Sequence, residues 1–410
     1  MSTRILHTAD WHLGARLIEC DRHAEHEAFV AWLLPQLVAL RPDLLIIAGD
    51  IFDSANPPQE ALTLYYTFLS ELARKVKCRT LILGGNHDSP ATLHAPREIL
   101  RALDVHVVAA PPADPAAALL ELSDAVVCAV PYLRERDVRT AQPGQSADLV
   151  AAAIREGIGR HYADILARAR AIAGDRVIVG TGHLTATGST ASPSERTIHI
   201  GNLGAVDAAC FTGFAYTALG HIHRPQRVGA GNSVRYAGSP IPLSFSEVDL
   251  PKEFRVIDIA GGQLTQHAVA IPEFRPLRRL TASVATLAAE LARHQGTAGG
   301  VLEPWVELTV TDGRTCPDLD RQVREAAAPL RLRVLKVLTP APAVGAGGAD
   351  AAPPPRSLTE LRPEDVFAER LRRETIDPAS PESIALTQTF HELLGGLYDT
   401  APAIPPEAAP

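Results

Sequence analysis

The chain has 410 residues, of which 46% are hydrophobic, and it carries a formal net charge of -8 at pH 7. This length predicts two or three domains, and the acidic balance argues against a protein that coats nucleic acid through bulk positive charge. No apolar run is long enough to span a bilayer, and residues 1–3 lead directly into a predicted strand. We therefore expect neither a transmembrane helix nor a signal peptide, and place the protein in the cytoplasm.

Two residue types exclude further classes of site. The 5 cysteines are scattered and never form a C-x-x-C pair, which argues for reduced, mostly buried thiols and against a zinc ribbon or a disulfide framework. None of the lysines follows Gly and precedes Ser or Thr. The chain therefore has no Walker A loop, and we expect no ATP site in it.

Strands and helices alternate from the N-terminus onward. Strands are predicted at residues 4–8, 44–49 and 81–83, and helices at residues 21–40 and 57–76. This alternation is typical of a parallel or mixed sheet covered by helices. Such a sheet places its functional groups just beyond the carboxyl ends of its strands.

The middle of the chain predicts a second sheet. Further strands are expected at residues 105–108, 125–130, 176–180 and 216–220, and a long helix at residues 147–173. Strands at residues 234–238, 254–259 and 263–269, the last two joined as a hairpin, are expected to give the second sheet a more antiparallel character. The predicted fold class is α/β (α+β), with a two-sheet sandwich flanked by helices in residues 1–274.

The pattern restarts on a smaller scale after residue 274. Residues 275–339 predict a compact α+β unit, with strands near Leu280 and at residues 305–310 and 330–338, and helices at residues 283–294 and 317–328. An Ala-, Gly- and Pro-rich linker follows at residues 340–356.

The C-terminal part predicts a helical segment at residues 357–400 and a disordered tail at residues 401–410. Two short amphipathic helices after a flexible linker have little else to bury against. They either fold back onto their own protein or dock onto a partner, and the second interpretation is favoured.

Polar residues follow the apolar strands at several separate places. These residues are Asp10, His12, Asp50, Asn86, His87, His183, His221 and His223. Any one of them alone could be a structural group, and Asn86 alone could cap a helix. Their recurrence at one predicted sheet edge favours a shared site. In extended backbone, residues two apart face the same way, so Asp10 with His12, and His221 with His223, each present two side chains to one place.

The residue types indicate a two-metal centre. Two carboxylates, four imidazoles and one amide oxygen are more ligands than one octahedral ion needs. Asp50 is the natural bridge, because a carboxylate can join two ions about 3.5–4 Å apart. The mixed nitrogen and oxygen donors favour Mn²⁺, Fe²⁺ or Co²⁺ over Mg²⁺. The residual positive charge of such a centre attracts a phosphate, for which the ions activate water.

His87 lies next to Asn86 and is not needed to fill a ligand shell. We interpret it as the group that stabilises the transition state or protonates the leaving oxygen. The alternative is a histidine that only orients a ligand.

These residues stand in motifs that resemble those of the calcineurin-like metallophosphoesterases. The motifs are D-x-H at residues 10–12, G-D at 49–50, G-N-H-D at 85–88, G-H at 182–183 and G-H-x-H at 220–223. Their particular forms resemble the branch of DNA double-strand-break repair nucleases that work with a large coiled-coil ATPase subunit. The resemblance covers about residues 4–260 and extends to the small unit and the tail only by layout.

The resemblance implies a ligand set, a metal and partners. One ion would be held by Asp10, His12, Asp50 and His223, and the other by Asp50, Asn86, His183 and His221. Mn²⁺ would be the usual ion and His87 the catalytic group. A capping domain would correspond to residues 275–339, and residues 357–400 would bind the ATPase.

The leading hypothesis is a Mn²⁺-dependent phosphodiesterase that acts on DNA ends and hairpins, with 3′ to 5′ polarity implied by the resemblance. It would work as a homodimer with two ATPase subunits. One alternative is a small-molecule phosphatase or nucleotide phosphodiesterase of the same fold, against which stand Asp53 and Asp88 at positions where related protein phosphatases carry other residues. Another is a non-catalytic DNA-tethering scaffold, against which stands the intact set of ligands.

Overall fold

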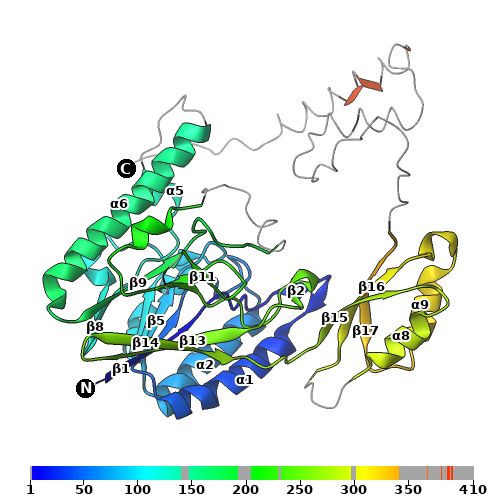
Figure 1. Ribbon diagram of the computed structural model, residues 1–410, viewed down its shortest axis with the longest axis horizontal. Helices are drawn as coiled ribbons and strands as arrows, with labels where there is room; N and C mark the ends of the chain where they lie inside the picture. Colours follow the sequence, from blue (N-terminus) through cyan, green and yellow to red (C-terminus); the bar gives the residue numbers. More distant parts are fainter. Residues whose placement is uncertain are drawn as a thin grey trace, which may run out of the picture. The chain divides into compact units, whose positions relative to one another are not determined.

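The computed structural model describes residues 2–139, 147–192, 205–229, 231, 233–296 and 302–340, together with six single residues further on. The chain divides into two compact units, Met1–Pro340 and Ala341–Pro410. The fold of the first unit is shown in Figure 1. No helix among the described residues is long and apolar enough to cross a membrane.

The first sheet has six strands in the order β14-β13-β1-β4-β5-β6. The four strands β1 (Ser2–Thr8), β4 (Leu44–Ile47), β5 (Arg79–Leu83) and β6 (Val105–Val108) are parallel. The antiparallel hairpin of β13 (Glu253–Ala260) and β14 (Gln263–Ala270) extends the sheet beside β1. The predicted alternation of strands and helices is confirmed in this half.

The second sheet also has six strands, in the order β11-β12-β10-β9-β8-β7. Its parallel centre is formed by β12 (Val234–Tyr236), β10 (Tyr216–Gly220), β9 (Val177–His183) and β8 (Ala125–Cys128). The edge strands β11 (Gln226–Val228) and β7 (Leu119–Glu121) run antiparallel to their neighbours. The predicted two-sheet sandwich is confirmed, because an apolar core of residues such as Ile46, Val127 and Ala218 fills the space between the sheets.

The predicted grouping of the later strands is wrong. Strands β13 and β14 join the first sheet, and β12 lies parallel to β10 instead of in an antiparallel sheet with them. The burial of β13 explains its place, since Val256 faces one core and Ile257 faces the other. A strand that is apolar on both sides needs cover on both, which the position beside β1 provides.

Helices cover the outer faces of both sheets (Figure 1). On the first sheet, α1 (His23–Leu40) and α2 (Gln59–Lys75) pack through one apolar core. Helix α1 buries Phe29, Leu33 and Leu37, which recur every fourth residue along one face. It begins two residues later than predicted, where Asp21 accepts a hydrogen bond from the His23 amide. On the second sheet, α6 (Ala147–Ala173) packs through a separate core.

Short elements complete the sandwich. They are β2 (Arg16–Leu17), β3 (Cys20–Asp21), α3 (Pro90–His94), α4 (Arg97–Arg101), α5 (Glu135–Val138), η1 (Pro115–Ala118), η2 (Ala208–Phe211) and η3 (Phe245–Glu247). All 5 cysteines are free thiols, as expected, but only Cys78 and Cys128 are buried, so the expectation that most are buried is wrong.

A third, smaller sheet lies at residues 277–338, where a compact α+β arrangement was predicted. Its strands β15 (Leu277–Ala282), β16 (Trp305–Val310) and β17 (Arg333–Leu338) are parallel. Helices α8 (Leu287–Arg293) and α9 (Leu319–Ala327) share its apolar core, and η4 (Gly313–Thr315) precedes α9. We call this part the capping unit; its boundary after residue 274 stays a prediction, because it belongs to the same compact unit as the sandwich.

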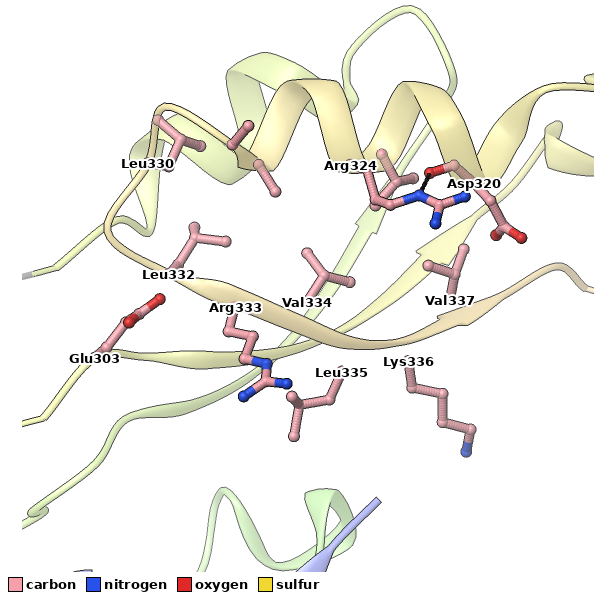
Figure 2. A pocket seen from close by; sticks show the side chains of 13 residues that line it. Glu303, Asp320, Arg324, Leu330, Leu332, Arg333, Val334, Leu335, Lys336 and Val337 are labelled. Carbon is pink, nitrogen blue, oxygen red and sulfur yellow. Dashed lines mark hydrogen bonds between the residues drawn. The ribbon is translucent and has the colours of Figure 1, made fainter. Parts of the chain in front are cut away.

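The side chains of β17 point to two sides of the small sheet (Figure 2). Val334 and Val337 point toward α9, where a groove of about 560 Å³ lies between strand and helix, whereas Leu335 and Lys336 point away from it. An irregular register between β16 and β17 accounts for two consecutive residues on one side. As a result, Leu335 packs against the apolar cluster that joins the capping unit to the sandwich.

The predictions for residues 340–356, 357–400 and 401–410 fall almost entirely outside the described residues. Phe367 and Phe390 are described, and their rings stack with centroids 4.2 Å apart.

Candidate metal centre

The predicted site residues from both sheets meet at one edge of the sandwich. Strands β1, β4 and β5 are parallel neighbours in the first sheet, as are β9 and β10 in the second. Within the described residues, three groups of side chains have their ligand atoms within 4.8 Å of one another. The groups are Asp10, His12 and Asp50; Asp50, His183 and His221; and His12, Asp53 and His87. Asp50 is common to the first two groups, so it lies where a bridging ligand belongs.

One group of donor atoms gathers around Asn86. The Asn86 side-chain oxygen is 2.9 Å from His183 Nε2 and 2.8 Å from His221 Nδ1. His183 Nε2 is also 3.2 Å from Asp50 Oδ2. His183 Nδ1 lies 2.9 Å from the carbonyl oxygen of Ala48, which can only accept, so in the neutral ring Nε2 carries the lone pair. Donor atoms therefore converge on one point, as in a metal site.

A second group of donor atoms includes those of Asp10 and His12. Asp10 Oδ2 and His12 Nε2 are buried and have no hydrogen-bond partner among the residues that the structure describes. His12 Nε2 lies 3.6 Å from Asp50 Oδ2. A buried polar atom without a partner costs about 1–3 kcal/mol, and coordination of a cation removes that cost. These unpartnered atoms and the nitrogen and oxygen donors fit a divalent metal ion.

His223 and His87 both lie close to His12. The His12 ring centroid is 5.1 Å from that of His223 and 4.8 Å from that of His87. His223 is 2% exposed, so its ring is buried. His87 is half-buried, and its Nδ1 lies 2.8 Å from the carbonyl oxygen of Asp53. The structure thus brings all of the predicted side chains together.

The pairs Asp10 with His12 and His221 with His223 reach the site by a different route from the one predicted. β1 ends at Thr8 and β10 ends at Gly220, so none of the four residues lies in extended strand backbone. Asp10, His12 and His221 have positive φ angles of 53°, 47° and 97°. The paired residues also diverge, because His221 approaches Asn86 whereas His223 lies beside His12.

Strained backbone marks this edge of the sandwich. Asp50 is a fourth site residue in the left-handed region, with φ 48°. Such a conformation costs a non-glycine residue about 1–3 kcal/mol and persists where the surroundings enforce it. Gly85 is required next to it, since a Cβ there would lie 2.8 Å from Asp50 Cγ and overlap the carboxylate oxygen. The turns that carry Gly85 and Asp50 are therefore in direct contact.

The electrostatics of the site favour positive charge between the carboxylates. Burial raises the pKa of Asp10 to about 7. Burial also disfavours the ionised form of Asp50, but the neighbouring His183 holds the Asp50 pKa well below its usual range. Conversely, burial disfavours a charged His183, yet the Asp50 carboxylate raises the His183 pKa to about 9. A centre that stabilises positive charge this strongly suits a metal cation.

Sequence reasoning missed three acidic residues that hold the predicted ligands in place. Asp53 Oδ1 lies 3.1 Å from His12 Nδ1, and Glu247 Oε1 lies 3.2 Å from His223 Nδ1. Asp88 accepts hydrogen bonds from the backbone amides of Ile51, Phe52 and Gly85, which fixes the turns that carry Asp50 and Asn86. Asp53 and Asp88 lie within motifs already recognised, and that was the available signal; nothing marks Glu247 in the sequence.

Comparison with known proteins agrees with this geometry. The family model for calcineurin-like phosphoesterases matches residues 3–225. This chain belongs to the calcineurin-like phosphoesterase family. The predicted fold and the predicted metal-dependent phosphodiesterase class are thereby confirmed, and a divalent metal site follows from the family fold and the donor clusters. A second model, described as the type 5 capsule protein repressor C-terminal domain, matches residues 273–375.

Curated relatives of this phosphoesterase are similar along most of its length. The SbcD component of nuclease SbcCD from Escherichia coli (strain K12) is 36% identical over 407 residues, which cover 96% of this chain and 99% of the relative. The protein of the same name from Rhodobacter capsulatus is 36% identical and covers 89% of this chain and 93% of its own length. The one from Bacillus subtilis is 31% identical over 67% of this chain and 71% of its own length.

Proposed function

We propose that this chain is the Mn²⁺-dependent DNA nuclease subunit of an ATP-dependent SbcCD-type complex. Its activities would be 3′ to 5′ exonuclease on duplex ends and endonuclease on single strands and hairpins. The observation that carries the proposal is the pair of donor clusters that share Asp50. The identity of the curated relatives, each named as part of a nuclease, directs the activity toward DNA.

Two Mn²⁺ ions would be held by the ligands that the clusters bring together. Asp10, His12, Asp50 and His223 would hold one ion, and Asp50, Asn86, His183 and His221 the other. The distances around Asn86 and the unpartnered atoms of Asp10 and His12 support this division. The ions would supply Lewis-acid activation of water and neutralise charge on the phosphate.

The protein's own groups would orient the phosphate and handle protons. His87 Nδ1 donates to the Asp53 carbonyl oxygen, which fixes the ring and directs Nε2 away from that contact. In its doubly protonated form, His87 can give the Nε2 proton to the departing oxygen of the phosphodiester. The His87 backbone amide lies 2.9 Å from Asp50 Oδ1, which ties the position of this histidine to the shared ligand.

The partners follow from the same proposal. Residues 357–400 would bind a large coiled-coil ATPase of the SbcC type, and two copies of each chain would form a heterotetramer. ATP would bind to the partner, in agreement with the missing Walker A loop. Deletion of the residues after Gly345 should abolish co-purification of the ATPase and leave Mn²⁺ binding unchanged. Retained co-purification would contradict the role given to the tail.

A direct assay tests the activity. Purified protein, alone and with its ATPase partner, is incubated with Mn²⁺ and end-labelled duplex or hairpin DNA. Asp50→Ala and His87→Leu should each abolish cleavage, whereas His106→Leu and Asp258→Ala, which change a half-buried histidine and a half-buried acid outside the site, should not. Full cleavage by Asp50→Ala would refute the two-metal centre.

A small-molecule substrate separates the enzymatic alternatives. Turnover of p-nitrophenyl phosphate without cleavage of any DNA would replace the nuclease by a phosphatase or nucleotide phosphodiesterase. Binding of DNA without hydrolysis of either substrate would indicate a scaffold protein.

A further inference from the structure

The 3₁₀ helix η3 touches both the capping unit and the metal centre. Phe245, its first residue, is 5% exposed and packs in one apolar cluster with Leu277 of β15 and Trp305 of β16. Glu247, its last residue, is fully buried and faces His223. Only one residue separates the two contacts, so a single turn of helix connects the capping unit to a predicted ligand.

Glu247 holds His223 through a closed set of polar contacts. Its Oε1 meets His223 Nδ1 at 3.2 Å, and its Oε2 accepts from Lys252 Nζ at 2.8 Å. Lys252 in turn donates to the His223 carbonyl oxygen at 3.2 Å and to Ser239 Oγ at 2.8 Å. Both the ring and the backbone of His223 are therefore held by the same buried ion pair.

The charge of Glu247 fixes the orientation of the His223 ring. Lys252 Nζ lies 2.8 Å from Glu247 Oε2, and both side chains are buried, so the carboxylate faces a cation as its ion-pair partner. An ionised carboxylate only accepts hydrogen bonds, so Nδ1 of His223 donates to it and the ring adopts the tautomer in which Nε2 can act as a metal ligand. A buried ion pair adds little net stability, so its effect here is on geometry.

We propose that Glu247 is a positioning residue for His223. We further propose that η3 couples the packing of the capping unit against it to the affinity of the protein for the ion that His223 would hold. The inference rests on the proposed function, because it takes His223 as a ligand of one of two ions. The coupling follows from close packing: a shift of Phe245 cannot be absorbed within a three-residue helix without moving Glu247. Loss of a partner that orients a metal-bound histidine typically lowers metal affinity by about 10- to 100-fold.

Mn²⁺ titration by calorimetry, with full-length protein, tests both links without reference to activity. Glu247→Gln should weaken one of the two Mn²⁺ sites by about 10-fold and leave the other unchanged. Leu277→Ala, which acts from the capping unit and touches no ligand, should weaken the same site. Leu291→Ala is the matched control, since both leucines are 0% exposed but Leu291 packs in the core of the capping unit away from η3.

The outcomes separate this inference from the proposed function. Weakening of one site by Glu247→Gln and by Leu277→Ala, with Leu291→Ala equal to wild type in Mn²⁺ affinity, supports it. Wild-type affinity at both sites in Glu247→Gln overturns the positioning role. An equal effect of the two leucine variants, or none in either, overturns the coupling. Wild-type protein that binds fewer than two ions overturns the proposed function, and this inference with it.

Discussion

Replacement of Gly85 by alanine is the sharpest test of Asp50 as the shared ligand. The added Cβ would lie 2.8 Å from Asp50 Cγ and overlap Oδ1 and the backbone nitrogen of the same residue. Carbon atoms in contact lie about 3.5–4.0 Å apart, so the carboxylate must retreat by roughly 1 Å. A displacement of that size in an active site can lower the rate by about 100-fold. We expect the loss of both ions, because Asp50 serves both positions.

Two other glycines provide controls for this variant. Gly84→Ala brings a Cβ within 2.8 Å of the Ala109 Cα, so it should destabilise the fold without reaching Asp50. Gly159→Ala, in α6, meets nothing within 4 Å and should be neutral or stabilise the helix by up to about 1 kcal/mol. Mn²⁺ stoichiometry, thermal unfolding and DNA cleavage are measured for all three. If Gly85→Ala binds two ions and cleaves DNA within about 3-fold of wild type, the assignment of Asp50 is refuted.

Three further changes test the surroundings of the site. Asp53→Ala removes the partner of His12 Nδ1 and should lower Mn²⁺ affinity or turnover by about 10- to 100-fold. Glu98→Ala, at an exposed position, is the control. If Asp53→Ala has no larger effect than this control, Asp53 does not support His12. His26 is fully buried, neither ring nitrogen has a hydrogen-bond partner among the described residues, and burial lowers its pKa from 6.5 to about 3. The free energy of unfolding of the wild type should therefore fall as the pH falls from 6.5 toward 3, because in this range only the unfolded chain binds a proton at His26. In urea unfolding with EDTA, His26→Leu should reduce the slope of this free energy against pH by up to about 1.4 kcal/mol per pH unit. An unchanged slope would contradict this prediction. Arg275→Met removes one of the two arginines that pair with the buried Glu25, together with the contact with the Trp305 ring. Because Arg22 still pairs with Glu25, unfolding by urea should show a loss of about 2 kcal/mol. A change below about 0.5 kcal/mol would mean that the junction with the capping unit does not depend on this arginine.

The sequence indicated a metal site because the predicted ligands stand in short local motifs. Asp50 and Asn86 follow apolar runs at residues 44–48 and 81–83, and such runs are recognisable from composition alone. Asp10 and His183 follow or end strands of mixed composition. The carboxyl ends of parallel neighbours meet at one edge whatever the rest of the fold does. The residue types and their places along the chain therefore predicted a shared metal centre.

Other features depended on contacts between distant segments. The hairpin of β13 and β14 joined the first sheet because β13 is apolar on both faces, and sequence periodicity does not name the strand it pairs with. Glu247 lies in an unremarkable loop, and only the approach of η3 to His223 gives it a role. Neither the pairing of β13 with β1 nor the contact of Glu247 with His223 can be predicted from the neighbouring residues in the sequence.

The sequence was thus enough to predict which side chains could bind metal and that they would lie at one edge of a sheet. How they divide was set by the packed fold: His221 faces Asn86, His223 lies beside His12, and Asp50 stands between them. The reason is physical, since local composition sets where a strand ends, whereas distances between ligands arise from the packing of two sheets. The same packing imposes left-handed backbone at Asp10, His12 and Asp50, which these residues would rarely adopt alone.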